Sequence, residues 1–202
     1  MGKRLVVVGN ASTPGGRAIT DEAETSRLSR FIDRADCVVR FNSVRNQDED
    51  WTGRRTDILY IRGHGRPACE FGETAIKFEG VDRPGHAIVV VDHYRYHRPG
   101  EDPYAFGDFT AQIVERNGFD DFSTLDRATM ANARRLVRKN GRLLTPSLGF
   151  LALVHLLGTQ RLAGYEKYLC GFVFEGWHGH PWTEEQEFVR GWIEMGRLRW
   201  LS

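Results

Sequence analysis

Short runs of β-branched residues, separated by helical patterns, constrain the fold of this chain more than any other feature. The runs at 4–8 and 87–91 are apolar and rich in valine, which is typical of strands buried on both faces of a parallel sheet. Further strands are predicted at 37–41, 57–61 and 168–173. The alternation favours an α/β fold with a doubly wound, largely parallel, Rossmann-like sheet.

Helices are predicted between these strands. One lies within 17–33, and two polar helices follow at 109–117 and 127–139. The segment 150–157 is apolar nearly all round and is therefore expected to be buried. A last helix starts at about Thr183, whose side chain can cap it.

Composition limits the possible partners and the compartment. The chain has 202 residues, 41% of them hydrophobic, which suits one domain over 1–202. A net charge of +1 gives no general attraction to nucleic acid, and no apolar run is long enough for a membrane span. Three cysteines without paired spacing indicate free thiols and a cytoplasmic protein.

The loop after the first strand has the composition of an anion-binding turn. Gly9, Asn10 and Ser12 follow the strand, and small residues lead toward the next helix. Backbone N–H groups and a helix start favour negative charge there, and the two polar side chains can add hydrogen bonds. The glycines match neither a dinucleotide fingerprint nor a P-loop, so a ligand loop and an ordinary tight turn both remain open.

Two later segments carry further polar candidates. Residues 145–150 read Thr-Pro-Ser-Leu-Gly-Phe, with Ser147 and Gly149 just before the buried helix, and a Pro-Ser helix cap would also explain them. Residues 176–187 contain His178, His180 and Glu185. An acidic residue there can equally stabilise the first turn of a helix.

In combination these segments resemble the motifs of the family 29 sialyltransferases, as a small bacterial stand-alone domain. Residues 7–12, 32–42 and 53–57 resemble the large sialyl motif, 145–150 with 169–172 resemble the small motif, and 180–185 match an HxxxxE motif. The resemblance implies a GT-A-like variant of the Rossmann-like sheet.

The resemblance also implies roles for single residues. Asn10 and Asn42 would contact the nucleotide of the donor, with Gly9 and Ser12 beside them. Ser147, Gly149 and Glu185 would bind the sugar or ribose, which completes the donor-binding set. His180 would be the catalytic base, and His178 would assist the phosphate leaving group.

The implied function is that of an enzyme, a metal-independent inverting glycosyltransferase. It would move a sugar from a CMP-activated donor such as CMP-sialic acid to the hydroxyl of a glycan or small-molecule acceptor, without a cofactor. Neutral asparagine amides suit a phosphate or a cytosine edge, and a neutral imidazole suits proton removal near neutral pH.

Departures from the pattern keep two alternatives open. Leu148 stands where the small motif has threonine, and His178 lies only two residues before His180. Both departures favour a non-catalytic nucleotide- or nucleotide-sugar-binding protein. A metal-binding accessory protein using His178, His180 and Glu184 is the other alternative. The Pro-, Gly- and Tyr-rich segment 93–108 is predicted to be a long surface loop.

Overall fold

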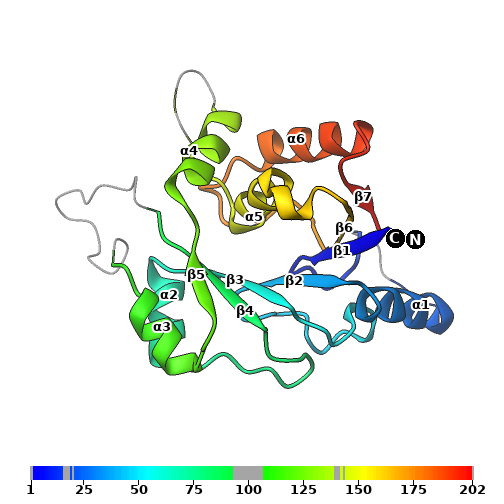
Figure 1. Ribbon diagram of the computed structural model, residues 1–202, viewed down its shortest axis with the longest axis horizontal. Helices are drawn as coiled ribbons and strands as arrows, with labels where there is room; N and C mark the ends of the chain where they lie inside the picture. The colour runs from blue at the N-terminus through cyan, green and yellow to red at the C-terminus, as the bar shows by residue number, and fades with distance from the viewer. Residues whose placement is uncertain are drawn as a thin grey trace.

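Seven parallel strands form one sheet, and helices cover both of its faces (Figure 1). The computed structural model describes residues 2–15, 19, 21–92, 107–138, 142 and 144–201. The strands are β1 (Lys3–Val8), β2 (Cys37–Phe41), β3 (Ile58–Arg62), β4 (His86–Val90), β5 (Phe122–Thr124), β6 (Tyr165–Cys170) and β7 (Arg199–Trp200). Their order is β5-β4-β3-β2-β1-β6-β7, and each neighbouring pair is parallel. The predicted Rossmann-like α/β fold is confirmed.

The predicted helices are present with adjusted ends. The helices are α1 (Glu22–Asp33), α2 (Arg66–Glu73), α3 (Thr110–Asn117), α4 (Arg127–Leu136), α5 (Leu148–Gly158) and α6 (Trp182–Glu194), with short 3-10 turns η1 (Asp50–Thr52) and η3 (Gln160–Leu162). Seven residues of α5 are buried, as its apolar composition predicts. The predicted cap by Thr183 is wrong, because α6 starts at Trp182 after Pro181 without a side-chain cap.

Three elements lack the sequence pattern that would have predicted them. Helix α2 has only eight residues and fully buries only Ala68, with Phe71 partly buried in the same cluster, so its apolar face is short. Strands β5 and β7 are the two edges of the sheet, and all of their residues are exposed. Most of the loop predicted at 93–108 lies outside the described residues.

Alternate residues of each central strand enter different cores. Leu5 and Val7 of β1 pack with α4, α5 and α6 on one face of the sheet. Val6 and Val8 face the opposite side, where they pack with α1. Helices α2 and α3 form a third cluster on that same side, against β3 and β4. Both faces of the sheet are therefore covered, which explains the continuous apolar runs in the sequence.

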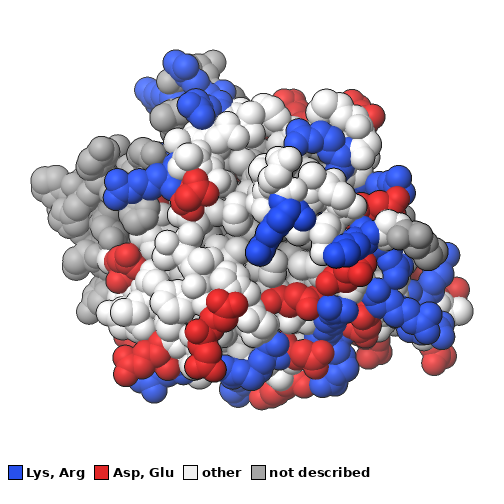
Figure 2. Space-filling view, in the orientation of Figure 1, with Lys and Arg blue, Asp and Glu red and all other residues white. Residues whose placement is uncertain are grey.

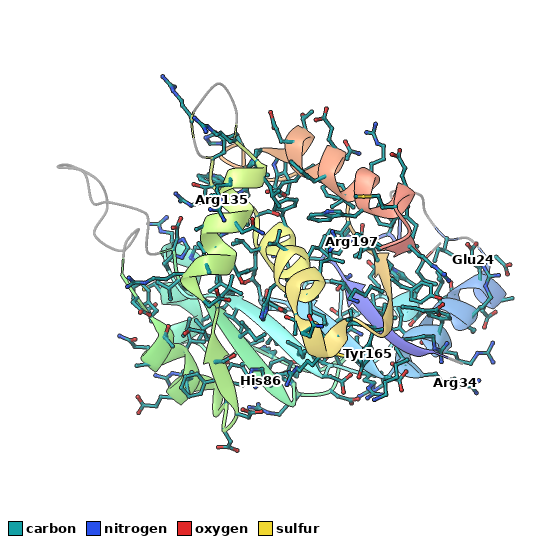
Figure 3. All side chains as sticks on the ribbon, turned by 45° about the horizontal axis from the view of Figure 1, so that its top comes forward. Glu24, Arg34, His86, Arg135, Tyr165 and Arg197 are labelled. Carbon is teal, nitrogen blue, oxygen red and sulfur yellow. The ribbon has the colours of Figure 1, made fainter. Side chains whose placement is uncertain are left out.

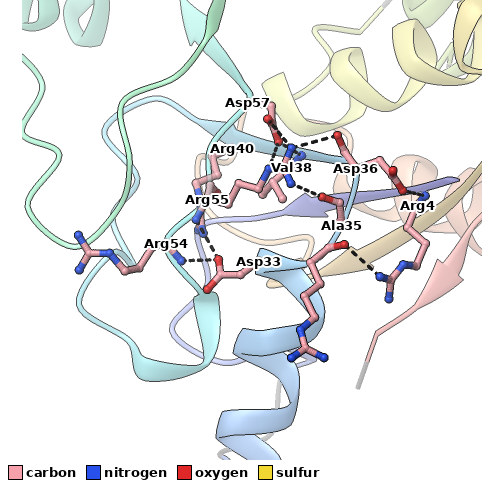
Figure 4. Close-up of polar contacts among 10 residues, drawn as sticks. Arg4, Asp33, Ala35, Asp36, Val38, Arg40, Arg54, Arg55 and Asp57 are labelled. Carbon is pink, nitrogen blue, oxygen red and sulfur yellow. Dashed lines mark hydrogen bonds and ion pairs between the residues drawn. The ribbon is translucent and has the colours of Figure 1, made fainter.

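A polar network ties the chain between β2 and β3 to the sheet (Figure 4). Arg55 donates to both carboxylate oxygens of Asp57, at 2.8 and 3.0 Å, and also to the Ala35 carbonyl. The same Asp57 carboxylate accepts the Val38 amide at 2.7 Å. Asp33 accepts the backbone amides of residues 54 and 55. The start of β3 is thus joined to the end of α1 and the start of β2.

The side chain of Arg40 also holds the segment between β2 and β3. Its side chain is fully buried and donates to the carbonyls of Thr52, Gly53 and Arg55, at 2.7, 2.9 and 3.1 Å. Burial lowers the pKa of Arg40 to about 10, which leaves the guanidinium charged at neutral pH. One buried cation therefore satisfies three main-chain acceptors in buried or partly buried positions.

Arg40→Met should reduce the free energy of unfolding by about 3 kcal/mol, because three buried carbonyls lose their donor. Urea denaturation followed by circular dichroism measures this loss. Arg54→Met is the matched control, since Arg54 is exposed and only its backbone amide contacts Asp33. The control should stay within about 0.5 kcal/mol of wild type. An equal, small change in both variants would contradict the role assigned to Arg40.

Candidate functional site

A cleft opens at the carboxyl ends of the strands, where the order of the sheet reverses between β1 and β6. Ligands bind at this position in open α/β sheets, because the loops that follow the two strands part there. The cavity measures about 650 Å³. It is lined by residues 9–13, 41–43, Arg45, Arg62, Pro67, Phe71, 147–149, 171–176, His180 and Trp182.

The backbones after β1 and β6 touch at the floor of this cleft. A Cβ atom on Gly9 would lie 2.1 Å from the carbonyl oxygen of Gly171, so only glycine fits there. Gly9 donates to the Cys170 carbonyl, and Ala11 donates to the Gly171 carbonyl. These two amides are therefore used within the protein. The backbone N–H groups that the sequence analysis expected to favour an anion therefore do not include those of Gly9 and Ala11.

The predicted helix end is not part of the cleft lining either. Helix α1 begins at Glu22, where Asp21 accepts the Ala23 amide as an N-cap. Glu22 and Glu24 lie in its first turn. Acidic residues already occupy the positive end of the helix dipole, so this end is not available to an anionic ligand in the cleft.

Two residues that sequence analysis did not identify shape the loop at 9–12. The amide nitrogen of Asn46 donates to the carbonyls of Gly9 and Ala11, at 2.8 and 2.9 Å. The indole of Trp51 donates to the Ser12 carbonyl at 3.0 Å. Both donors come from the chain between β2 and β3, which no local pattern connects with residue 9.

Asn10 and Asn42 present complementary polar groups to the cleft. The Asn10 amide nitrogen donates to the Phe41 carbonyl at 3.3 Å, and its Oδ1 is buried without a hydrogen-bond partner in the described chain. Asn42 adopts a left-handed backbone, with φ at 50°. Its Oδ1 accepts the Arg62 amide at 3.0 Å, so its Nδ2 is the donor left for a ligand. The cleft wall thus holds one amide donor, on Asn42, and beside it a covered amide oxygen, on Asn10, without a partner in the described chain.

Ser147 lines the cleft but its hydroxyl is already engaged. It caps α5 by accepting the Phe150 amide, and it donates to Glu185 at 2.6 Å. The Ser147 backbone amide also donates to Glu185, at 2.6 Å. Glu185 is 1% exposed and lies behind Ser147 rather than at the cavity wall. The predicted sugar contact by Glu185 is corrected to a positioning role for the start of α5.

Glu185 is an unusual group for a buried helix turn. Burial raises the pKa of its carboxyl to about 7, and the two hydrogen bonds from Ser147 oppose this only in part.

Gly149, also predicted for the site, lines the cleft, but a Cβ there would lie 2.9 Å from the Phe172 ring. The absence of its side chain therefore makes room for Phe172.

His180 lies in the cleft wall between two tryptophan rings. Its ring centroid is 4.9 Å from that of Trp177 and 5.1 Å from that of Trp182, both edge to face. Its Nδ1 is 3.0 Å from the Thr145 carbonyl oxygen. A carbonyl can only accept, so Nδ1 is a ring nitrogen that carries a proton. His178 is exposed and is not among the residues that line the cavity, although its ring also packs against Trp177, with 5.7 Å between centroids.

Charged groups at the cleft were missed by the sequence analysis. Arg45 and Arg62 are both in its lining, and exposed Glu175 is at its rim. Arg62 ends β3 and its guanidinium lies 3.0 Å from Nε2 of buried His64. The sequence did contain a signal for Arg62, because a charged residue at the carboxyl end of a buried strand indicates the ligand-binding end of the sheet.

Within the described residues, no group of three or more His, Cys, Asp or Glu side chains could hold a metal ion.

The architecture defines the class of protein as one with a sialyltransferase-like fold. A mammalian sialyltransferase matches 98% of this chain and 68% of its own, with a TM-score of 0.58 and 16% identity. The sialyltransferase CstII of Campylobacter jejuni, solved with the substrate analogue CMP-3FNeuAc, matches 98% and 81% with a TM-score of 0.54 and 12% identity. At these identities the likeness is one of fold. No family model matches the sequence.

The sequence itself identifies the family. The chain is 30% identical over 220 residues to the urease operon 23 kDa accessory protein of Rhizobium meliloti (strain 1021), over 99% of this chain and 93% of that protein. The chain belongs to the family of this accessory protein. The prediction of a metal-independent inverting glycosyltransferase is therefore wrong, because the relative is an accessory protein and the sialyltransferases share only the fold. No helix in the described part of the chain could cross a bilayer.

Glu185→Gln should remove a pH dependence of stability. Because the folded state raises the pKa of this carboxyl from 4.5 to about 7, the folded chain binds the proton more tightly than the unfolded chain. Stability from this group is therefore present at low pH and lost as the pH rises through that window. The difference in unfolding free energy between Glu185→Gln and wild type should grow by roughly 2–3 kcal/mol from about pH 4.5 to 7.5.

Urea denaturation at several pH values measures this difference. Glu187→Gln is the control, since it removes one carboxylate from the same helix at an exposed position. It should follow wild type across the range. A pH-independent difference between Glu185→Gln and wild type would show that burial does not raise the pKa of this carboxyl.

Proposed function

We propose that the protein is a non-catalytic binding protein for a pyrimidine nucleotide or nucleotide-sugar of the CMP type, serving in an accessory role. The observation that carries the proposal is the unpaired Oδ1 of Asn10, buried in the wall of the cleft within the described chain. Buried polar atoms are almost always hydrogen-bonded, so we expect a bound ligand to turn this side chain toward the cavity and to donate to its oxygen. A cytosine amine or a sugar hydroxyl supplies such a donor.

The other polar groups of the cleft support the same ligand. The Nδ2 of Asn42 offers a donor to a carbonyl or phosphate oxygen, since its Oδ1 is held by the Arg62 amide. Arg45 and Arg62 supply positive charge for the phosphate. A cavity of about 650 Å³ suits a nucleotide or nucleotide-sugar. CstII, which has the same fold, was solved with a CMP-linked sugar analogue.

Several features favour binding without turnover. The relative at 30% identity is an accessory protein. Leu148 presents an apolar side chain to the cleft where the sialyl motif has threonine, and the Ser147 hydroxyl donates to Glu185. His178 is not among the residues that line the cavity. The cleft keeps groups that recognise a ligand and lacks the second histidine that the sialyltransferase motif would place near a leaving group.

Asn42→Ala should weaken CMP binding at least about tenfold, because it removes a donor and also leaves the Arg62 amide without its acceptor. Isothermal titration with CMP, and with AMP as a comparison, measures the affinity. Asn132→Ala is the matched control, since Asn132 is exposed on α4. It should bind CMP like wild type. Thermal unfolding of both variants checks that each remains folded.

Incubation with CMP-sialic acid tests the non-catalytic part. Chromatography should show the donor intact at the rate seen in buffer, with any simple sugar present as acceptor. Absence of CMP binding at millimolar ligand would reject the nucleotide site. Release of CMP faster than in buffer, abolished by His180→Ala, would reject a purely binding role.

A further inference from the structure

Four arginines line a second concavity, at the amino ends of the strands and thus opposite the cleft. Arg4, Arg27, Arg30 and Arg34 line a cavity of about 280 Å³, together with Phe31. Arg4 is the second residue of β1, whose other end leads into the cleft, and Arg34 directly follows α1. The corner therefore lies at the amino ends of β1 and β2, and Figure 2 shows Lys and Arg gathered over the α1 side of the molecule.

The spacing of these arginines works against helix stability. Positions 27, 30 and 34 lie on one face of α1, and like charges at such spacings repel. In the described chain, none of the four guanidinium groups forms an ion pair with a carboxylate. Asp36 reaches this corner, but it accepts the Arg4 backbone amide at 2.7 Å. The Asp36 carboxylate thus lies close to the corner, but the described chain contains no ion pair between it and any of the four guanidinium groups.

Two of the guanidinium groups are held in place. Arg4 donates to the Arg34 carbonyl at 3.0 Å, and its Cζ lies 4.8 Å from the centre of the Phe31 ring. Phe31 in turn packs edge to face against Tyr168, at 5.0 Å. Arg30 donates through Nε to the Ser26 carbonyl. Each of these two arginines has N–H groups beyond those contacts, so a ligand would meet donors that are already oriented.

We propose that this corner binds the phosphate group of a small molecule. Guanidinium groups recognise phosphate by paired, charge-assisted hydrogen bonds, and bound phosphate would relieve the repulsion between the arginines. A concavity of 280 Å³ suits one or two phosphoryl groups. The net charge of +1 and the interspersed acidic residues around α1 do not form the extended basic track that a nucleic acid needs.

Isothermal titration with pyrophosphate and with inorganic phosphate tests the proposal on the full-length protein. The double variant Arg27→Gln with Arg30→Gln should lose at least about tenfold in affinity for the phosphate ligand. The control is Arg135→Gln with Arg138→Gln, which removes the same charge from exposed positions at the α4 end. Figure 3 places Arg135 far from Arg34. The control should bind within about twofold of wild type.

The outcomes separate this site from the cleft. CMP affinity should be unchanged in the Arg27/Arg30 variant, and phosphate binding at the corner should be unchanged in Asn42→Ala. Equal losses in both arginine pairs would overturn the proposal in favour of general charge attraction. No binding of either phosphate ligand to wild type would also overturn it. Binding of duplex DNA or polyglutamate alone, lost in the Arg27/Arg30 variant, would replace it with a macromolecular surface.

Discussion

The backbone contact between Gly9 and Gly171 is the constraint on which the cleft depends. Strands β1 and β6 lie side by side at the reversal of strand order, and their continuing chains meet with no room for a Cβ atom on Gly9. Hydrogen bonds from Gly9 and Ala11 to the end of β6 fix this crossing. Both walls of the cavity start from it. A side chain at either glycine would separate those walls before any ligand contact was made.

The electrostatics of the cleft follow from where its charged groups are directed. Two arginines line the cavity, whereas the buried acid Glu185 faces Ser147 behind the wall. Asn10 uses its amide nitrogen within the protein, and Asn42 uses its amide oxygen. This leaves one acceptor on Asn10 and one donor on Asn42. An anionic ligand with its own donors and acceptors is the chemistry that completes this arrangement.

The fold of this chain resembles that of sialyltransferases, whereas its sequence places it in the family of an accessory protein. A parallel sheet with a loop crossing at its reversal point is a general scaffold, so sialyltransferases can share it at 16% and 12% identity. The accessory protein shares 30% of the sequence over nearly the whole chain. The motifs that resemble a sialyltransferase include residues such as Gly9 and Gly149, whose absent side chains are required by packing. Packing alone therefore accounts for these glycines, whatever the chemistry of the site.

The sequence by itself determined the central strands, the buried helix α5 and the general position of the cleft, because each depends on a local apolar pattern or on a rule about strand ends. It could not determine which amides of the loop at 9–12 are used, or that Asn46 and Trp51 hold its carbonyls, because those contacts join residues more than thirty positions apart. The cleft arginines, the buried partner of Ser147 and the arginine corner were likewise decided by tertiary structure alone. Only packing brings side chains from separate elements within hydrogen-bonding distance, and only burial gives a carboxyl such as Glu185 its altered acidity.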